Sequence, residues 1–172
     1  GLLGDNKSVT MFHVELAKRR ADETRLIVND PNKASNVAST VADLRSEMAT
    51  IGDKLNQNDG VIGADVAQEI KKNTDQITDV LQNAKTDLLA DSTAGSDSLA
   101  EDVKATKDLV QDVTSKAVEV MVTKNLEGAT SVSKDEVTAA VNSLAASIVS
   151  EAATSSINLT SSTPTIVSSS KP

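Results

Sequence analysis

The sequence predicts an all-α protein: an elongated antiparallel bundle of four long helices plus a shorter fifth, followed by a Ser/Thr-rich C-terminal tail. The 172 residues include one Phe and no Trp or Tyr, so the core must be aliphatic, which suits helix packing. Apolar residues recur at alternating spacings of three and four, the period of one helix face. Polar segments of about four to nine residues separate these stretches, which favours antiparallel neighbours.

The first predicted helix covers residues 8–28 and ends before the breaker Asn29-Asp30-Pro31. Arg20 and Glu23 interrupt the apolar face of this predicted helix. The predicted core stripe lies near Phe12, Leu16 and Ile27, with Val14, Ala17, Ala21, Thr24 and Val28 beside it.

The second and third predicted helices, residues 32–56 and 64–90, have the most regular alternation. Such rows predict buried faces between helices that cross at a shallow angle. Asn73 is the one polar residue in the third row, a position that often fixes register. The rows are Val37, Val41, Leu44, Met48, Ile51 and Leu55, and then Val66, Ile70, Asn73, Ile77, Leu81, Ala84 and Leu88.

The fourth and fifth predicted helices, residues 98–125 and 133–153, each begin with a capping box. Ser98 with Glu101, and Ser133 with Glu136, have the required spacing of three. The predicted buried rows are Leu99, Val103, Thr106, Val110, Val113, Ala117 and Val120, widened by Leu109 and Met121, and then Val137, Val141, Leu144 and Ile148.

From residue 154 onward, 11 of 19 residues are Ser or Thr, a composition typical of a linker or tail. We therefore expect a bundle domain over residues 1–153 and a tail or spacer over residues 154–172. The alternatives to a free tail are packing along the bundle or pairing with a partner, through the apolar residues Ile157, Leu159, Ile166 and Val167.

The composition opposes most catalytic chemistry. One His and no Cys speak against thiolate catalysis, Cys/His zinc sites, Ser-His-Asp triads and His-ligated haem. No phosphate-binding glycine loop or nucleophile elbow is present. We expect no enzyme activity, no cofactor and no metal site. His13 is expected at the edge of the core, and a loose calcium site at Asp53, Asn58 and Asp59 is the alternative to an ordinary polar turn.

The charge balance, 17 basic against 25 acidic residues, gives a net charge of −8 and opposes general nucleic-acid binding. The sequence contains no run of 18 apolar residues, so it predicts no membrane span. Within the first helix, Lys18 with Asp22 and Arg19 with Glu23 are spaced to pair on one face. We expect three cations of this helix to face a partner, namely Lys18, Arg19 and Arg25. The four apolar tail residues named above are expected to do the same.

Residues 12–23, Phe-His-Val-Glu-Leu-Ala-Lys-Arg-Arg-Ala-Asp-Glu, follow the upstream Leu3-Gly4-Asp5. Over residues 1–55 this pattern resembles an uncharacterised family of helical domains found outside the cytoplasmic membrane of bacteria and archaea. The resemblance implies a cell-surface domain tethered by an upstream segment that is removed from this chain. It implies no catalytic residues.

The leading functional expectation is a non-enzymatic extracytoplasmic structural or protein-interaction domain, extracellular or on the cell surface. It would present helix faces to a protein partner or to copies of itself, for example as a surface-layer or filament subunit. The alternative is a ligand-sensing helical bundle of a receptor-type surface protein. Such a sensor needs convergent polar groups in an apolar pocket, whereas Asn73, Thr106 and Arg20 are isolated polar residues on the predicted faces.

Overall fold

A computed structural model describes residues 2–56, 62–91, 93, 95–128 and 130–161, with side chains for the part of these ranges between residues 7 and 151. Its regular structure is entirely helical, which confirms the predicted all-α class. The elements are α1 (Leu2–Val28), a 3₁₀ helix η1 (Pro31–Asn36), α2 (Val37–Asn56), α3 (Ala64–Ala90), α4 (Ser96–Leu126) and α5 (Lys134–Ser161).

The chain forms two compact units, Gly1–Ser133 and Lys134–Pro172. The first contains α1 to α4, and α5 belongs to the second. The predicted boundary between bundle and tail at residue 153 therefore falls inside α5, which continues to Ser161. None of the helices in the described part of the chain combines the length and hydropathy that a bilayer crossing requires.

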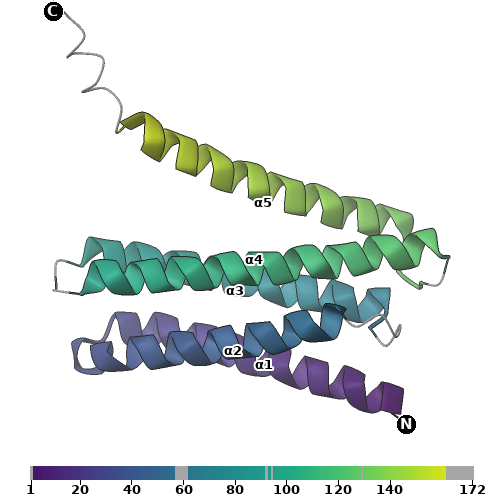
Figure 1. Cartoon of the computed structure of the whole chain (residues 1–172), viewed down its shortest axis with the longest axis horizontal. Helices are drawn as coiled ribbons and strands as arrows, with labels where there is room; N and C mark the ends of the chain where they lie inside the picture. Colours follow the sequence, from purple (N-terminus) through teal and green to yellow (C-terminus); the bar gives the residue numbers. More distant parts are fainter. Residues whose placement is uncertain (1, 57–61, 92, 94, 129, 162–172) are drawn as a thin grey trace, which may run out of the picture. The chain divides into compact units, whose positions relative to one another are not determined.

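The first unit is a four-helix bundle built from two antiparallel hairpins (Figure 1). α1 packs against α2, and α3 packs against α4. The hairpins meet through α1 beside α3 and α2 beside α4, and each of these pairs runs in the same direction. The consecutive helices α2 and α3 consequently lie diagonally opposite each other. The sequence indicated the hairpins but not this diagonal connection.

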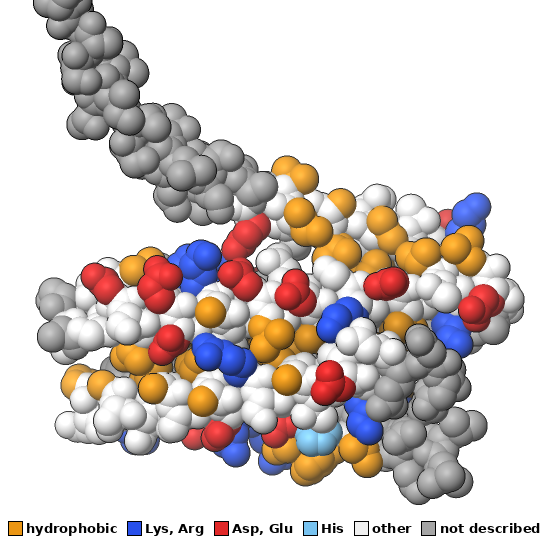
Figure 2. Space-filling view, viewed as in Figure 1, with side chains coloured by type: hydrophobic (Ala, Val, Ile, Leu, Met, Phe, Trp, Pro, Cys, Tyr) orange, Lys and Arg blue, Asp and Glu red, His pale blue; other side chains and the backbone are white. Residues whose placement is uncertain are grey.

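The core of the bundle is aliphatic and follows the predicted rows most closely in α2 and α3. Every residue of both predicted rows is buried, including Asn73. In α4 the middle of the row is buried, while Leu99 and Val120 at its ends are half-buried. On the face shown in Figure 2, acidic side chains gather along α4. The exposed acids of this helix include Glu101, Asp102, Asp108, Asp112 and Glu119.

The predicted core face of α1 is wrong for Phe12, which is 60% exposed, and for Leu16, which is only half-buried. The reason is geometric. A residue two positions from a buried one is turned by about 200° around a helix, so Phe12, midway between Thr10 and Val14, is directed away from the core. The buried row alternates by four and three through small and β-branched side chains: Thr10, Val14, Ala17, Ala21 and Thr24.

Three helix starts also differ from the prediction. α1 begins at Leu2, before the predicted residue 8. Pro31 opens the 3₁₀ helix, with the Asp30 carboxylate accepting a hydrogen bond from the Asn32 N–H (3.0 Å), and α2 begins only at Val37. α4 begins at Ser96 after Gly95, whose φ of 90° suits glycine, so Ser98 lies inside the helix and its predicted capping box is wrong.

Candidate interaction surfaces

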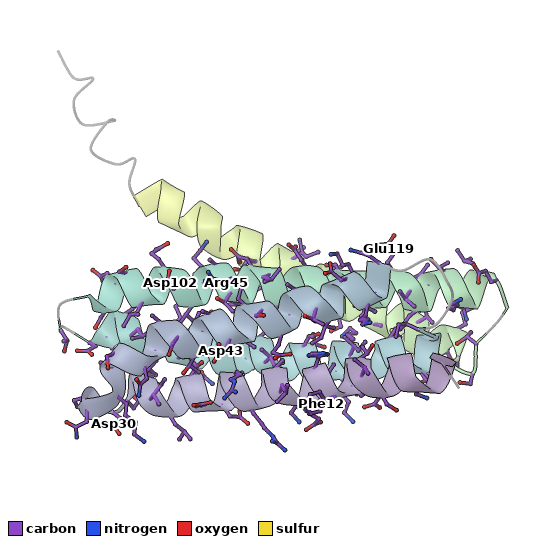
Figure 3. All side chains as sticks on the ribbon, turned by 60° about the horizontal axis from the view of Figure 1, so that its bottom comes forward. Phe12, Asp30, Asp43, Arg45, Asp102 and Glu119 are labelled. Atoms are coloured by element: carbon purple, nitrogen blue, oxygen red, sulfur yellow. The ribbon has the colours of Figure 1, made fainter. Side chains whose placement is uncertain are left out.

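The outer side of α1 carries the first candidate surface. Phe12, the only aromatic residue of the chain, projects away from the bundle there (Figure 3). Val9, one helical turn earlier, is also exposed, and Arg19 lies two turns later on the same side of the helix. We call Val9, Phe12 and Arg19 the α1 surface. The sequence prediction placed Phe12 on the core stripe, whereas the alternation of four and three from Thr10 to Thr24 leaves it outside.

Polar contacts to α2 fix the orientation of this side of α1. His13, next to Phe12, forms a hydrogen bond from Nδ1 to Glu47 Oε2 (2.5 Å), and the Phe12 and His13 rings meet edge to face at 5.8 Å. About two turns further along, Arg20 Nε lies 4.0 Å from Asp43 Oδ2. These contacts join α1 to α2 beside the α1 surface, so that Phe12 is presented on a fixed helix. The prediction of a core-edge position for His13 is confirmed.

The predicted charge pairs of α1 form differently. Glu23 accepts a hydrogen bond from Arg20 (2.9 Å) rather than from Arg19, and this bond raises the pKa of Arg20. In the described part of the chain no ion pair joins Lys18 to Asp22. Arg19 is left exposed on the outer side, two turns from Phe12.

The other two predicted partner-facing cations of α1 lie on a different flank. Lys18 comes 11 residues after Lys7, and Arg25 comes seven residues after Lys18. These spacings place all three on one side of the helix. Lys7 contacts Asp65 of α3 at 3.7 Å, so this side faces α3. The structure therefore separates Lys18 and Arg25 from Arg19 and places only Arg19 on the same side of the helix as Phe12.

The four predicted tail residues give no surface that can be described. The backbone of Ile157 and Leu159 belongs to α5, but their side chains lie outside the described residues. Ile166 and Val167 lie entirely outside them, as do Asn58 and Asp59 of the alternative calcium site. Among the residues described, no group of three acidic or histidine side chains is arranged to hold a metal ion.

The second candidate surface is on α5. Most of its predicted buried row is not buried: Val141 and Ile148 are exposed, and Leu144 is half-buried. Val149 is exposed as well. α5 thus presents large apolar side chains to solvent over two turns.

An open cleft of about 420 Å³ lies at the end of the bundle where α1 turns into the 3₁₀ helix. Asn29 donates a hydrogen bond to Asp87 across it (3.0 Å). Asp91 accepts hydrogen bonds from the Thr93 hydroxyl (2.6 Å) and N–H (2.9 Å), and these lower the pKa of its carboxyl. The lining combines these polar groups with Val28, Asp30, Pro31, Ala34 and Ala90.

The polar residues within the bundle are occupied by structural contacts. Thr106 accepts hydrogen bonds from the Arg45 guanidinium (3.0 and 3.3 Å), which joins α2 to α4 (Figure 3). Asn73 donates to the Glu69 carbonyl (2.7 Å). Across the described side chains, every buried polar atom has a hydrogen-bond partner. The buried polar residues of the described helices are therefore engaged in structural contacts and offer no free group to a ligand between the helices.

Comparisons with protein-family models, with curated proteins and with solved structures find no match.

Proposed function

We propose that this chain is a non-enzymatic structural or protein-interaction domain that presents helix faces to a partner or to copies of itself. One observation carries the proposal: the only aromatic side chain is held outward on the α1 surface, 60% exposed. Exposed aromatic and Arg side chains are the residue types that most often dominate protein interfaces. Phe12 and Arg19 provide both types on one side of a helix that is anchored to α2.

Photo-crosslinking in the cells that produce the chain tests this proposal. Phe12 is replaced by a benzophenone amino acid, and Leu89, which is 55% exposed on α3, is replaced in a matched control. We expect irradiation to give a defined covalent adduct from position 12 and none from position 89. Equal adduct formation at both positions, or none at position 12, would contradict an interaction role for the α1 surface.

The extracytoplasmic location is part of the same proposal. It is supported by the Ser/Thr-rich end of the chain and by the resemblance of residues 1–55. A membrane-impermeant amine reagent tests it, because exposed Lys side chains such as Lys72 and Lys104 are accessible on the folded domain. Labelling in intact cells should equal labelling after lysis. Labelling that requires lysis would contradict the location.

A ligand-sensing role is the second candidate, supported by the cleft beside Asp87. Three carboxylates and several apolar side chains line it, which suits a small organic cation. If the chain is a sensor of such a ligand, a polyamine such as spermidine should raise the melting temperature of the wild type more than that of Asp87→Asn. Equal shifts in both proteins would indicate unspecific binding to the acidic surface and exclude this role for the cleft.

A further inference from the structure

α5 differs from the other helices in its charge. Residues 137–150 include no Asp, Glu, Lys or Arg, the longest such run among the described helices. Within it, exposed apolar side chains occur at positions i, i+4, i+7 and i+8, which lie on one side of a helix. We call this set the α5 stripe: Val141, Ala145, Ile148 and Val149.

Charge limits where two copies of this chain can meet. The net charge is −8, and the outer side of α4 carries Glu101, Asp108, Asp112 and Glu119 at spacings of seven, four and seven. Two copies that approach through such faces repel each other, and desolvating the carboxylates adds a further cost. The α5 stripe has neither penalty, because it carries no charge and already exposes apolar surface.

We propose that the α5 stripe binds the α5 stripe of a second copy, so that two α5 helices form a symmetric pair. A stripe with a repeat of four and three is complementary to itself, as a two-fold contact requires. The described part of the Lys134–Pro172 unit contains one helix, and a single helix gains most of its stability from packing against another element. This inference deepens the proposed function by assigning the contact between copies.

The contact is small. Two helices that meet over about two turns bury less than the roughly 800 Å² per partner of a standard interface. We therefore expect a dissociation constant in the micromolar range, with monomer and dimer both present at accessible concentrations. Sedimentation equilibrium of the full chain measures this directly.

The decisive variant combines Val141→Lys with Ile148→Lys, which places four like charges in the paired contact. We expect it to weaken dimerisation at least about tenfold, because burying unpaired charges is costly. The matched control is Leu89→Lys, since Leu89 and Ile148 are 55% and 52% exposed. It should dimerise like the wild type. A wild type that stays monomeric throughout, or a dimer that the double variant leaves unchanged, overturns the proposal.

Cross-linking gives a second measurement that does not depend on the folding of the Lys variant. Because the sequence has no Cys, a single Ala145→Cys substitution provides one thiol per chain at the centre of the stripe. Mild oxidation should give much more disulfide-linked dimer than the control Ala105→Cys, whose position on α4 is also exposed. Equal yields would contradict the pairing of α5. The α1 crosslink at position 12 is independent of both results, so the two proposals fail separately.

Discussion

α1 and α3 are both 27 residues long and lie side by side in the bundle, yet they bury different kinds of side chain. α3 buries large aliphatic residues such as Ile70, Ile77 and Leu81. α1 buries small ones such as Ala17 and Ala21 and leaves the larger Phe12 in solvent. Helix period, rather than side-chain size, therefore determines which face of each helix enters this core. It also shows that large apolar residues outside the core are available for contacts with other molecules.

The largest effect should come from shortening a buried side chain of α3. Leu81 is fully buried, and Leu81→Ala should lower the free energy of unfolding by about 2–5 kcal/mol through lost transfer energy and a residual cavity. Leu89→Ala, the same change on the exposed side of α3, should stay within about 0.5 kcal/mol. Urea denaturation followed by circular dichroism measures both. Similar losses would mean that the buried row of α3 is misassigned.

The sequence was sufficient to predict α3 because its buried row combines the right period with large apolar residues. Val66, Ile70 and Ile77 are distinguishable from their neighbours by both criteria, whereas only the period separates buried Leu88 from exposed Leu89. In α1 the two criteria conflict: the period selects Thr10 and the alanines, and size selects Phe12. The class of the fold and the bounds of α3 followed from sequence, but the inward face of α1 did not.

The two candidate surfaces were less accessible to sequence reasoning. Arg19 was predicted to face a partner, but its pairing with Glu23 was expected, and the side chain of Arg20 takes that place. Whether Arg19 or Arg20 binds Glu23 depends on side-chain rotamers and on the nearby Asp43 of α2. The spacing of residues along α1 shows neither. The diagonal placement of α2 and α3 depends likewise on contacts between hairpins, which no local pattern encodes.

Enlarging the buried row of α1 should have the second-largest effect. Ala17 is fully buried, so Ala17→Leu forces extra atoms into a closely packed contact and should cost about 1–3 kcal/mol. Ala42→Leu on the exposed side of α2 is the matched control and should change stability little. If Ala17→Leu stabilises the protein in thermal or urea denaturation, α1 packs loosely, and its contrast with α3 is weaker than the structure indicates.

Hydroxyl groups give a smaller contrast between the same two helices. Thr74 of α3 lies 2.7 Å from the Thr114 hydroxyl of α4, whereas Thr24 of α1 donates to the Arg20 carbonyl of its own helix (2.7 Å). Thr114→Val removes a bond between helices and should cost about 1 kcal/mol. Thr24→Val keeps the shape and the backbone bonds and should stay within about 0.5 kcal/mol. The reverse order in urea denaturation would contradict the role of Thr114.

The smallest effect on stability is expected at Phe12, although it is the largest side chain of α1. Because Phe12 is 60% exposed, Phe12→Ser loses little buried area and should lower the free energy of unfolding by no more than about 0.5 kcal/mol. Val14→Ser, two residues away and fully buried, should cost several times as much, because it removes apolar contacts and buries a hydroxyl. Parallel urea titrations compare the two. If Phe12→Ser is the more damaging change, Phe12 belongs to the core, the inward and outward sides of α1 are reversed, and the α1 surface has no aromatic residue to offer a partner.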